Sequence, residues 1–282
     1  MTGSVDELPR RVESLAATPA GEALPPAAAA VVEELLDALE RGAVRSAERG
    51  ADGTWNAVPW VKRGILLGFR VGTITDMSVP PFTFLDKHTY PPQRFSSGSG
   101  VRIVPGGSSV RRGAYLAPGV VCMPPMYVNV GAYVGEGTMV DSHALVGSCA
   151  QVGARVHLSA AAQIGGVLEP VNAAPVIIED DVLVGGNCGV YEGTVVRKRA
   201  VLAAGVVLTR GTPIFDLVHE TVYRAEESKP LVVPENAVIV PGARAIRGGW
   251  GEMQKLSLQT PVIVKYRDER TDVATALESW LR

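Results

Sequence analysis

The sequence predicts a parallel β-helix built from six-residue repeats, preceded by a small helical domain. From Ala114 onward, one position in every six is aliphatic in all cases but one. This column comprises Leu116, Cys122, Val128, Val134, Val140, Val146, Val152, Leu158 and Ile164, followed by Ile178, Val184, Val190, Val196, Leu202, Leu208 and Ile214. A period of six matches neither an α-helix nor a simple alternating strand. It is typical of three short strands and three corners per turn of about 18 residues, with the aliphatic side chains pointing inward.

The first 100 residues are predicted to form a helical domain and a linker. Residues 30–48 space their apolar side chains as one face of a helix, which Gly42 weakens or ends. A second apolar-periodic run predicts a helix over about residues 59–69. Proline, serine and glycine accumulate over residues 78–100, which favours a linker.

The repeats predict a β-helix over residues 101–217. The segment 166–175, GVLEPVNAAP, breaks the six-residue frame and is therefore expected to leave the prism as a loop, where function often concentrates. Beyond residue 217 the repeat pattern stops. Residues 218–282 are expected to form strands joined by turns, with a short closing helix in the final segment DVATALESWLR.

The composition excludes several classes of function. The chain has 282 residues, of which 46% are hydrophobic, and a formal net charge of −2 without blocks of like charge. This pattern argues against binding to nucleic acid or to a membrane surface. The N-terminus lacks the features of a signal peptide, and no segment approaches the roughly 18 apolar residues of a membrane span. We therefore expect a cytoplasmic protein with small molecules or copies of itself as partners.

The cysteine and histidine patterns argue against a metal site. Cysteine occurs three times without CxxC spacing, which predicts buried free thiols at Cys122, Cys149 and Cys188. A zinc lyase of the γ-carbonic-anhydrase kind also uses this β-helix, but it needs three converging histidines. Only His143 and His157 lie within the repeats.

Several strings are specific enough to point to one family. They are VNVGAYVGEGTMVD at 128–141, VGSCAQVG at 146–153, VHLS at 156–159 and IGGVLEP at 164–170, with weaker similarity over 55–70. The chain resembles the tetrahydrodipicolinate N-succinyltransferases of the bacterial lysine and diaminopimelate pathway. The resemblance implies a left-handed β-helix, although parallel crossovers are normally right-handed. It also implies a homotrimer with sites between subunits.

The activity implied by this resemblance is succinyl transfer from succinyl-CoA to the amine of ring-opened tetrahydrodipicolinate. No tightly bound cofactor is expected. The family's catalytic aspartate in the string MVD corresponds to Asp141, which follows an inward valine and is expected to face outward. Arg102 in VRIVP is expected to bind the substrate, because guanidinium groups suit carboxylates. Asn129 and Glu169 are further candidate substrate contacts.

The acyl donor is expected to lie along the last turns of the coil. Family precedent places the pantetheine arm of coenzyme A there, where small residues let a thin chain approach backbone amides. The candidate contacts are Gly185, Gly186, Ala204 and Gly205, although such residues are also ordinary at corners.

One departure from the family pattern leaves the mechanism open. Gly189 stands where the best-studied members have a glutamate that partners the aspartate. Either Asp141 works alone, or Glu192 or His143 takes the partner's part, or the donor or acceptor differs. His143 has the ring chemistry of a general base, and His157 is compatible with a structural or a catalytic part. Acetyl-CoA as donor, a related amino-dicarboxylate as acceptor and an inactive scaffold are the alternatives.

Overall fold

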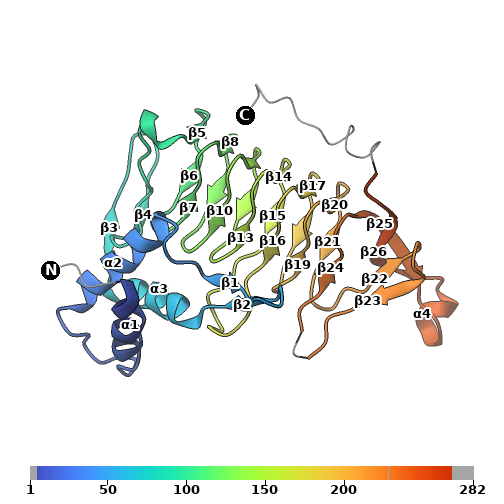
Figure 1. The fold of residues 1–282 in the computed structure, drawn as a ribbon, viewed down its shortest axis with the longest axis horizontal. Coiled ribbons are helices and arrows are strands. Elements are labelled where there is room, and N and C mark those ends of the chain that lie inside the picture. The colour runs from blue at the N-terminus through green and yellow to red at the C-terminus, as the bar shows by residue number, and fades with distance from the viewer. Residues whose placement is uncertain (1–4, 228, 269–282) are drawn as a thin grey trace.

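The computed structural model describes residues 5–227 and 229–268, and its centre is a parallel β-helix with three flat faces (Figure 1). Nearly every strand of the coil is two residues long. Face 1 takes β5 (Arg102–Ile103), β8 (Val121–Cys122), β11 (Met139–Val140), β14 (His157–Leu158), β17 (Leu183–Val184) and β20 (Val201–Leu202). Face 2 takes β6 (Ser109–Val110), β9 (Tyr127–Val128), β12 (Leu145–Val146), β15 (Gln163–Ile164), β18 (Gly189–Val190) and β21 (Val207–Leu208). Face 3 takes β7 (Tyr115–Leu116), β10 (Tyr133–Val134), β13 (Gln151–Val152), β16 (Ile177–Ile178), β19 (Val195–Val196) and β24 (Val232–Val233).

The predicted aliphatic column forms the core of the molecule. Val134 pairs in parallel register with Val152, and Val140 with Leu158, so each turn advances the chain by eighteen residues. Every residue of the predicted column is buried in one continuous cluster. Burial of this column accounts for the hydrophobic stabilisation of strands that are too short to be stable alone.

The corners of the coil require particular residues at two positions. Glycine often follows the inward residue, because a Cβ atom at Gly135 would lie only 2.5 Å from the carbonyl carbon of Gly153 on the next turn. The third residue after the inward residue adopts a positive φ, as at His143 (62°) and Gly205 (80°). The repeated pattern of an aliphatic residue followed by glycine is therefore explained by the close stacking of successive turns.

The coil begins before and ends after the repeats that reveal it in the sequence. It starts at β5, and its last turns include β24 and the first half of β25 (Ala237–Ala245). An excursion over residues 209–231 interrupts it and contains β22 (Ile214–Asp216) and β23 (Thr221–Tyr223). The expectation that the pattern ends at residue 217 is therefore corrected, because Val196 pairs with Val233 across this excursion.

The remaining C-terminal elements extend the ten-stranded sheet. The long strand β26 (Ser257–Tyr266) pairs with β25 and with β22, and the short helix α4 (Gly249–Met253) lies between β25 and β26 in the chain. The closing helix expected in the final segment lies outside the described residues.

The N-terminal domain packs three helices into a second core. These are α1 (Leu8–Ala16), α2 (Ala28–Glu40) and α3 (Pro59–Val71), preceded by the 3-10 turn η1 (Val5–Glu7). The helix predicted over 59–69 is confirmed as α3. Gly64 lets α3 approach α2, because a Cβ atom there would lie 2.2 Å from Leu35 Cδ2.

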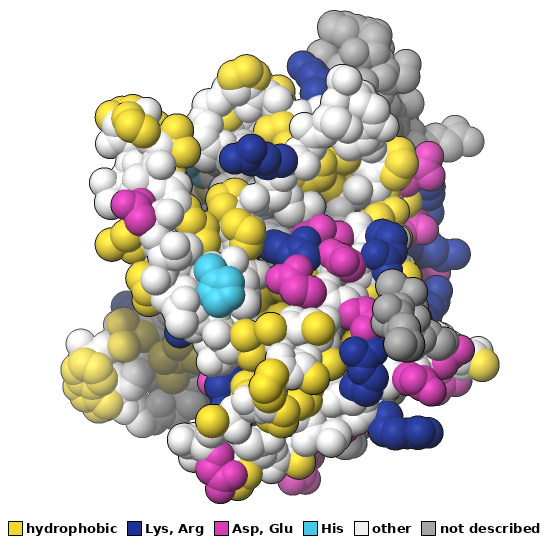
Figure 2. Space-filling view, turned by 90° about the vertical axis from the view of Figure 1, so that its left-hand side faces the viewer, with side chains coloured by type: hydrophobic (Ala, Val, Ile, Leu, Met, Phe, Trp, Pro, Cys, Tyr) yellow, Lys and Arg dark blue, Asp and Glu magenta, His cyan; other side chains and the backbone are white. Residues whose placement is uncertain are grey.

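Two hairpins accompany the helices: one lies between α2 and α3 in the chain and packs against face 3 of the coil, and the other follows α3. The first joins β1 (Ala47–Arg49) to β2 (Trp55–Ala57), and the second joins β3 (Ile74–Asp76) to β4 (Leu85–Lys87). Part of the expected linker over 78–100 is thus the ordered strand β4, followed by the 3-10 turn η2 (Ser97–Ser99). Figure 2 views the end of the molecule that carries these helices and shows basic and acidic side chains interspersed.

The corner between faces 2 and 3 carries the additions to the coil. The loop 166–175 lies there between β15 and β16, and the excursion 209–231 lies between β21 and β24. The N-terminal helices pack on the same corner, where Lys62 Nζ donates to the carbonyl oxygen of Ala173 at 2.5 Å. The corner between faces 1 and 2 keeps its six-residue spacing from Cys122 to Leu208. No helix among residues 5–227 and 229–268 is long and apolar enough to cross a membrane.

Candidate active site

Asp141 lies beside His157 on the outside of the coil. Asp141 follows the inward Val140 at the corner between faces 1 and 2, and its Oδ2 atom is 3.8 Å from Nε2 of His157. The Asp141 side chain is 30% exposed, whereas both ring nitrogens of His157, whose side chain is 19% exposed, are shielded from solvent. Asp141 Oδ1 accepts a hydrogen bond from the backbone N–H of Ser142 at 2.7 Å, which leaves the second oxygen toward the imidazole.

The coil register brings these two residues together. Met139 pairs with His157, so the histidine follows the aspartate by almost one turn. The contact between Asp141 and His157 was not predicted from the sequence, and the signal that could have found it is the eighteen-residue repeat itself. A carboxylate beside an imidazole can orient the ring and stabilise its protonated form.

His143 is placed by its backbone at the corner that follows Asp141. It occupies the positive-φ position, and its backbone N–H donates to the carbonyl oxygen of Pro125 at 2.5 Å. With Tyr127 and Leu145, it lines a shallow pocket of about 260 Å³ on face 2. His143 therefore lies near Asp141 along the chain but borders a different face from His157.

Arg102 lies on the same face as the Asp141–His157 pair. It pairs in register with Val121, which in turn pairs with Met139, so Arg102 stands two strands before Met139. Adjacent strands are about 4.8 Å apart, which puts the two backbones about 10 Å apart. This separation is compatible with a substrate that spans several atoms between its carboxylates and its amine.

Three predicted site residues lie on or near the corner between faces 2 and 3. Asn129 Oδ1 accepts hydrogen bonds from the backbone N–H of Val130 at 2.8 Å and from Arg111 at 3.4 Å. Glu192 Oε2 accepts one from the backbone N–H of Arg210 at 2.8 Å. Glu169 is exposed in the loop 166–175. Within one chain, none of these three is brought to Asp141.

The predicted donor contacts continue the corner on which Asp141 lies. Gly185 and Gly186 follow β17, and Ala204 and Gly205 follow β20, further along the coil than Asp141. A Cβ atom at Gly185 would lie 2.6 Å from the backbone nitrogen of Ala204, so coil stacking alone requires this glycine. Gly185 is buried, whereas Gly186, Ala204 and Gly205 are partly or fully exposed and form a strip of small residues on the corner that carries Asp141.

The outward space at Gly189 is filled by Tyr191, which the sequence analysis did not single out. A Cβ atom at Gly189 would lie 2.5 Å from Tyr191 Cε2 and 2.9 Å from its hydroxyl oxygen. A Cβ atom at Gly165 would lie 2.7 Å from Cδ1 of the same ring. The tyrosine ring thus covers both glycines on face 2.

The cysteines are buried free thiols, as predicted. Burial raises the pKa of Cys122 to about 12 and that of Cys149 to about 11, which suits neither nucleophile nor metal ligand. Within the described parts of the chain, histidine, cysteine, aspartate and glutamate side chains do not gather in threes as a metal ion would need.

Comparison with known proteins identifies the family. Residues 13–71 match the family described as tetrahydrodipicolinate N-succinyltransferase N-terminal, and residues 175–210 match the hexapeptide repeat of succinyl-transferase. The 2,3,4,5-tetrahydropyridine-2,6-dicarboxylate N-succinyltransferase of Nitrobacter hamburgensis is 44% identical over 261 residues, and that of Bradyrhizobium diazoefficiens is 46% identical over 263 residues. Each alignment covers 89% of both chains. The chain belongs to the tetrahydrodipicolinate N-succinyltransferase family.

Family membership confirms the predicted left-handed β-helix of hexapeptide repeats and the assignment as an acyltransferase. A solved structure titled a putative 2,3,4,5-tetrahydropyridine-2-carboxylate N-succinyltransferase from Campylobacter jejuni is 16% identical, with a TM-score of 0.45. That alignment covers 82% of this chain and 62% of the other.

Proposed function

We propose that this protein transfers the succinyl group of succinyl-CoA to the amine of ring-opened tetrahydrodipicolinate, in the diaminopimelate and lysine pathway. The observation that carries the proposal is the outward Asp141–His157 pair, with 3.8 Å between carboxylate and imidazole. It lies at the start of a strip of small residues, in a chain 44% and 46% identical to two proteins named for this reaction.

The reaction needs a base that accepts the proton of the attacking amine. The amine nitrogen attacks the thioester carbonyl carbon, the C–S bond breaks, and the proton lost by nitrogen is delivered to the departing sulfur. We assign the proton to the Asp141 carboxylate, which is the exposed member of the pair, and propose that the shielded imidazole of His157 positions it. A single base suffices, because the net reaction moves one proton from nitrogen to sulfur.

Substrate binding follows from the same face and corner. Arg102 on face 1 is proposed to hold a carboxylate of the acceptor. The acyl-CoA arm is proposed to lie along the strip that includes Gly186 and Gly205, so that its thioester reaches the Asp141–His157 pair.

A homotrimer is proposed because the coil presents long flat faces. In such an assembly the corner between faces 2 and 3 of one copy, with Asn129 and Glu192, would approach Asp141 of the next. Sedimentation equilibrium of the purified protein tests this, and a monomer that is active at assay concentrations would contradict it.

The donor is tested by thiol release from succinyl-CoA and from acetyl-CoA, with L-2-aminopimelate as a stable acceptor. We expect release with succinyl-CoA, reduced by about 10²–10⁴-fold in Asp141→Asn, which keeps an oxygen for the Ser142 N–H. Asp181→Asn is the matched control, since Asp181 pairs with Arg155 on another corner. Release with acetyl-CoA alone would change the donor, and silence with both donors would reject the proposal.

A further inference from the structure

A second pocket lies on face 3, away from the Asp141 corner. It has a volume of about 590 Å³ and runs along the corner between faces 3 and 1, beneath the segment 45–55. None of the candidate active-site residues lines it. Its volume is within the range of ligand sites for small molecules.

Arg45 forms the inner wall of this pocket. Its guanidinium carbon lies 3.7 Å from the centroid of the Tyr133 ring, and its Nε donates to Gln151 Oε1 at 2.9 Å. Gln151 is 1% exposed, and its amide nitrogen donates to the carbonyl oxygen of Cys149 at 2.9 Å, which fixes the orientation of its side chain. Across the described residues, no hydrogen bond from the terminal nitrogens of Arg45 is present, so this two-pronged donor remains for a ligand.

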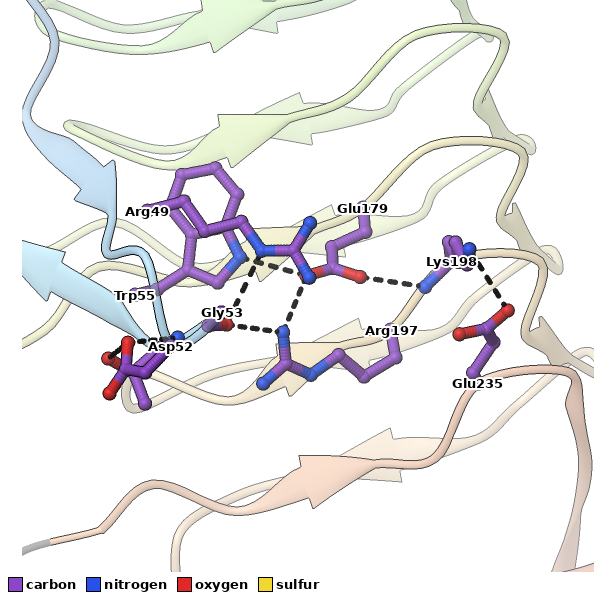
Figure 3. A network of polar contacts seen from close by, with 9 residues as sticks. Arg49, Asp52, Gly53, Trp55, Glu179, Arg197, Lys198 and Glu235 are labelled. Carbon is purple, nitrogen blue, oxygen red and sulfur yellow. Dashed lines mark hydrogen bonds and ion pairs between the residues drawn. The ribbon is translucent and has the colours of Figure 1, made fainter.

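The outer wall is held rigidly by Glu179, which is 7% exposed (Figure 3). Glu179 Oε1 accepts hydrogen bonds from Trp55 Nε1 at 2.9 Å and from Arg197 at 2.8 Å. Its second oxygen accepts one from the backbone N–H of Lys198 at 3.0 Å. Both oxygens of the Glu179 carboxylate thus accept hydrogen bonds from the protein. The bond from Trp55 fixes its indole ring as one side of the pocket.

The corner side of the pocket carries two accessible carboxylates. Glu136 and Asp180 occupy equivalent corner positions two turns apart, with Ala154 between them, and both are exposed. One oxygen of Asp180 accepts the backbone N–H of Ala154 at 2.8 Å, which orients the carboxylate. Apolar surface from Tyr115 and Pro118 lines the same space.

We propose that this pocket binds a free α-amino acid, with its carboxylate on Arg45, its ammonium group between Asp180 and Glu136, and its side chain against the aromatic wall. Arg49 and Lys198 also line the pocket, but they are paired with Glu179 and Glu235. A simple anion would leave the two carboxylates opposed to it, and a simple cation would meet Arg45. A zwitterion satisfies both signs of charge. This inference goes beyond the proposed acyl transfer and uses none of its residues.

The electrostatics of Arg45 agree with this geometry. Burial lowers the pKa of Arg45 from its ordinary value, against the attraction of Tyr133 and Asp180. An incoming carboxylate therefore meets a cation that has already lost part of its hydration, so the ion pair forms with less further loss of water.

The first test measures binding to the purified full-length protein by calorimetry and by the change in tryptophan fluorescence, since Trp55 lines the pocket. The probes are L-leucine, L-phenylalanine and L-lysine. Two analogues of leucine each lack one charged group: 4-methylpentanoate has no amine, and 3-methylbutylamine has no carboxylate. We expect both analogues to bind at least about tenfold more weakly than leucine. No binding of any amino acid at about 10 mM, or equal binding of either analogue, would overturn the proposal.

The second test uses variants of the pocket. Arg45→Met removes the charge but keeps a long apolar side chain, and Asp180→Asn keeps the acceptor for the Ala154 N–H. Both are expected to weaken binding by at least about tenfold. Arg155→Met is the matched control, because Arg155 is an exposed guanidinium on the same corner that does not line the pocket.

Unchanged binding in Asp180→Asn and in a folded Arg45→Met would contradict the proposed contacts. Displacement of the amino acid by succinyl-CoA would assign the pocket to the acyl donor and also overturn the proposal. Because the readout is binding alone, loss of the proposed acyl transfer in an activity assay leaves this test unaffected.

Discussion

Gly189 and Tyr191 form a matched pair on face 2. The glycine leaves space that the tyrosine ring fills, since a Cβ atom at residue 189 would lie 2.5 Å from that ring. The glycine at residue 189 is therefore matched to a bulky neighbour. Placing a carboxylate at residue 189 is expected to require a smaller side chain at residue 191.

This coupling predicts a non-additive pair of substitutions. Gly189→Glu alone is expected to lower the free energy of unfolding by about 1–3 kcal/mol, because the new side chain collides with Tyr191. The combination with Tyr191→Val is expected to recover most of that loss. Urea denaturation measures both. Gly211→Glu is the control, since a Cβ atom at Gly211 meets nothing within 4 Å, and a fully stable Gly189→Glu protein would contradict the coupling.

The outward position of Asp141 could be predicted from the sequence, because it follows an inward valine in the six-residue frame. The contact with His157 could not, because it depends on the pairing of successive turns. The position of Glu192 on another corner depends on which of the three faces its preceding strand belongs to. Residue types and local period thus predict orientation, while proximity requires the three-dimensional register.

At the scale of elements, Glu179 fastens the β1–β2 hairpin to the coil. Burial acts to raise the pKa of Glu179, but hydrogen bonds from Trp55, Arg197 and Lys198 outweigh it and hold the pKa below its usual value of 4.5. The ionised form is therefore favoured by folding. The stabilisation that it gives is present above the unfolded pKa and is lost as the pH falls through the lower, folded pKa.

Glu179→Gln is expected to lower the free energy of unfolding at pH 7 by about 1–2 kcal/mol, because the buried hydrogen bonds lose their charged acceptor. The variant should also lose less stability than the wild type when the pH is lowered below 4.5. Urea unfolding at several pH values checks both effects. Glu136→Gln, an exposed carboxylate on the same corner, serves as control, and equal pH profiles for Glu179→Gln and wild type would refute the role.

The elements that sequence analysis found are those with a strong local period. Helix α3 and the inward column were predicted because their apolar spacing is regular. The return of the coil at β24 was not predicted, because the excursion 209–231 breaks the frame before it resumes. A corner insertion costs little stability when its two ends remain close together. The coil therefore tolerates the excursion 209–231, although that excursion hides the later turn from the six-residue pattern.

At the scale of the whole molecule, the inward column behaves as one continuous core. Leu158 lies in the middle of it and is fully buried. Leu158→Ala is expected to lower the free energy of unfolding by about 2–5 kcal/mol, because the stacked turns on either side restrict collapse of the cavity. Urea denaturation followed by circular dichroism measures this. Leu217→Ala, at a leucine that is 64% exposed, should change stability little, and equal losses at the two positions would contradict a shared core.

The docking of the N-terminal helices on the corner between faces 2 and 3 was not predictable from their own sequence. It depends on small residues far along the chain, such as Gly113, where a Cβ atom would lie 2.7 Å from Leu36 Cδ2. Nothing in the local pattern of α2 or of the repeats connects these two segments. The helical period predicts which side of α2 is apolar, but the residues that pack against that side are determined by the fold of the coil.

The corner between faces 1 and 2 keeps a constant distance between successive turns, because its six-residue spacing is uninterrupted. Backbone amides recur there once per turn, about every 4.8 Å, and the turns cannot slide because the inward column fixes their register. The length of a ligand that fits along the corner is therefore set by the number of turns that it spans. A point substitution can change which group it meets on one turn, but only the gain or loss of a complete turn can change the distance from the Asp141–His157 pair to the far end of the strip.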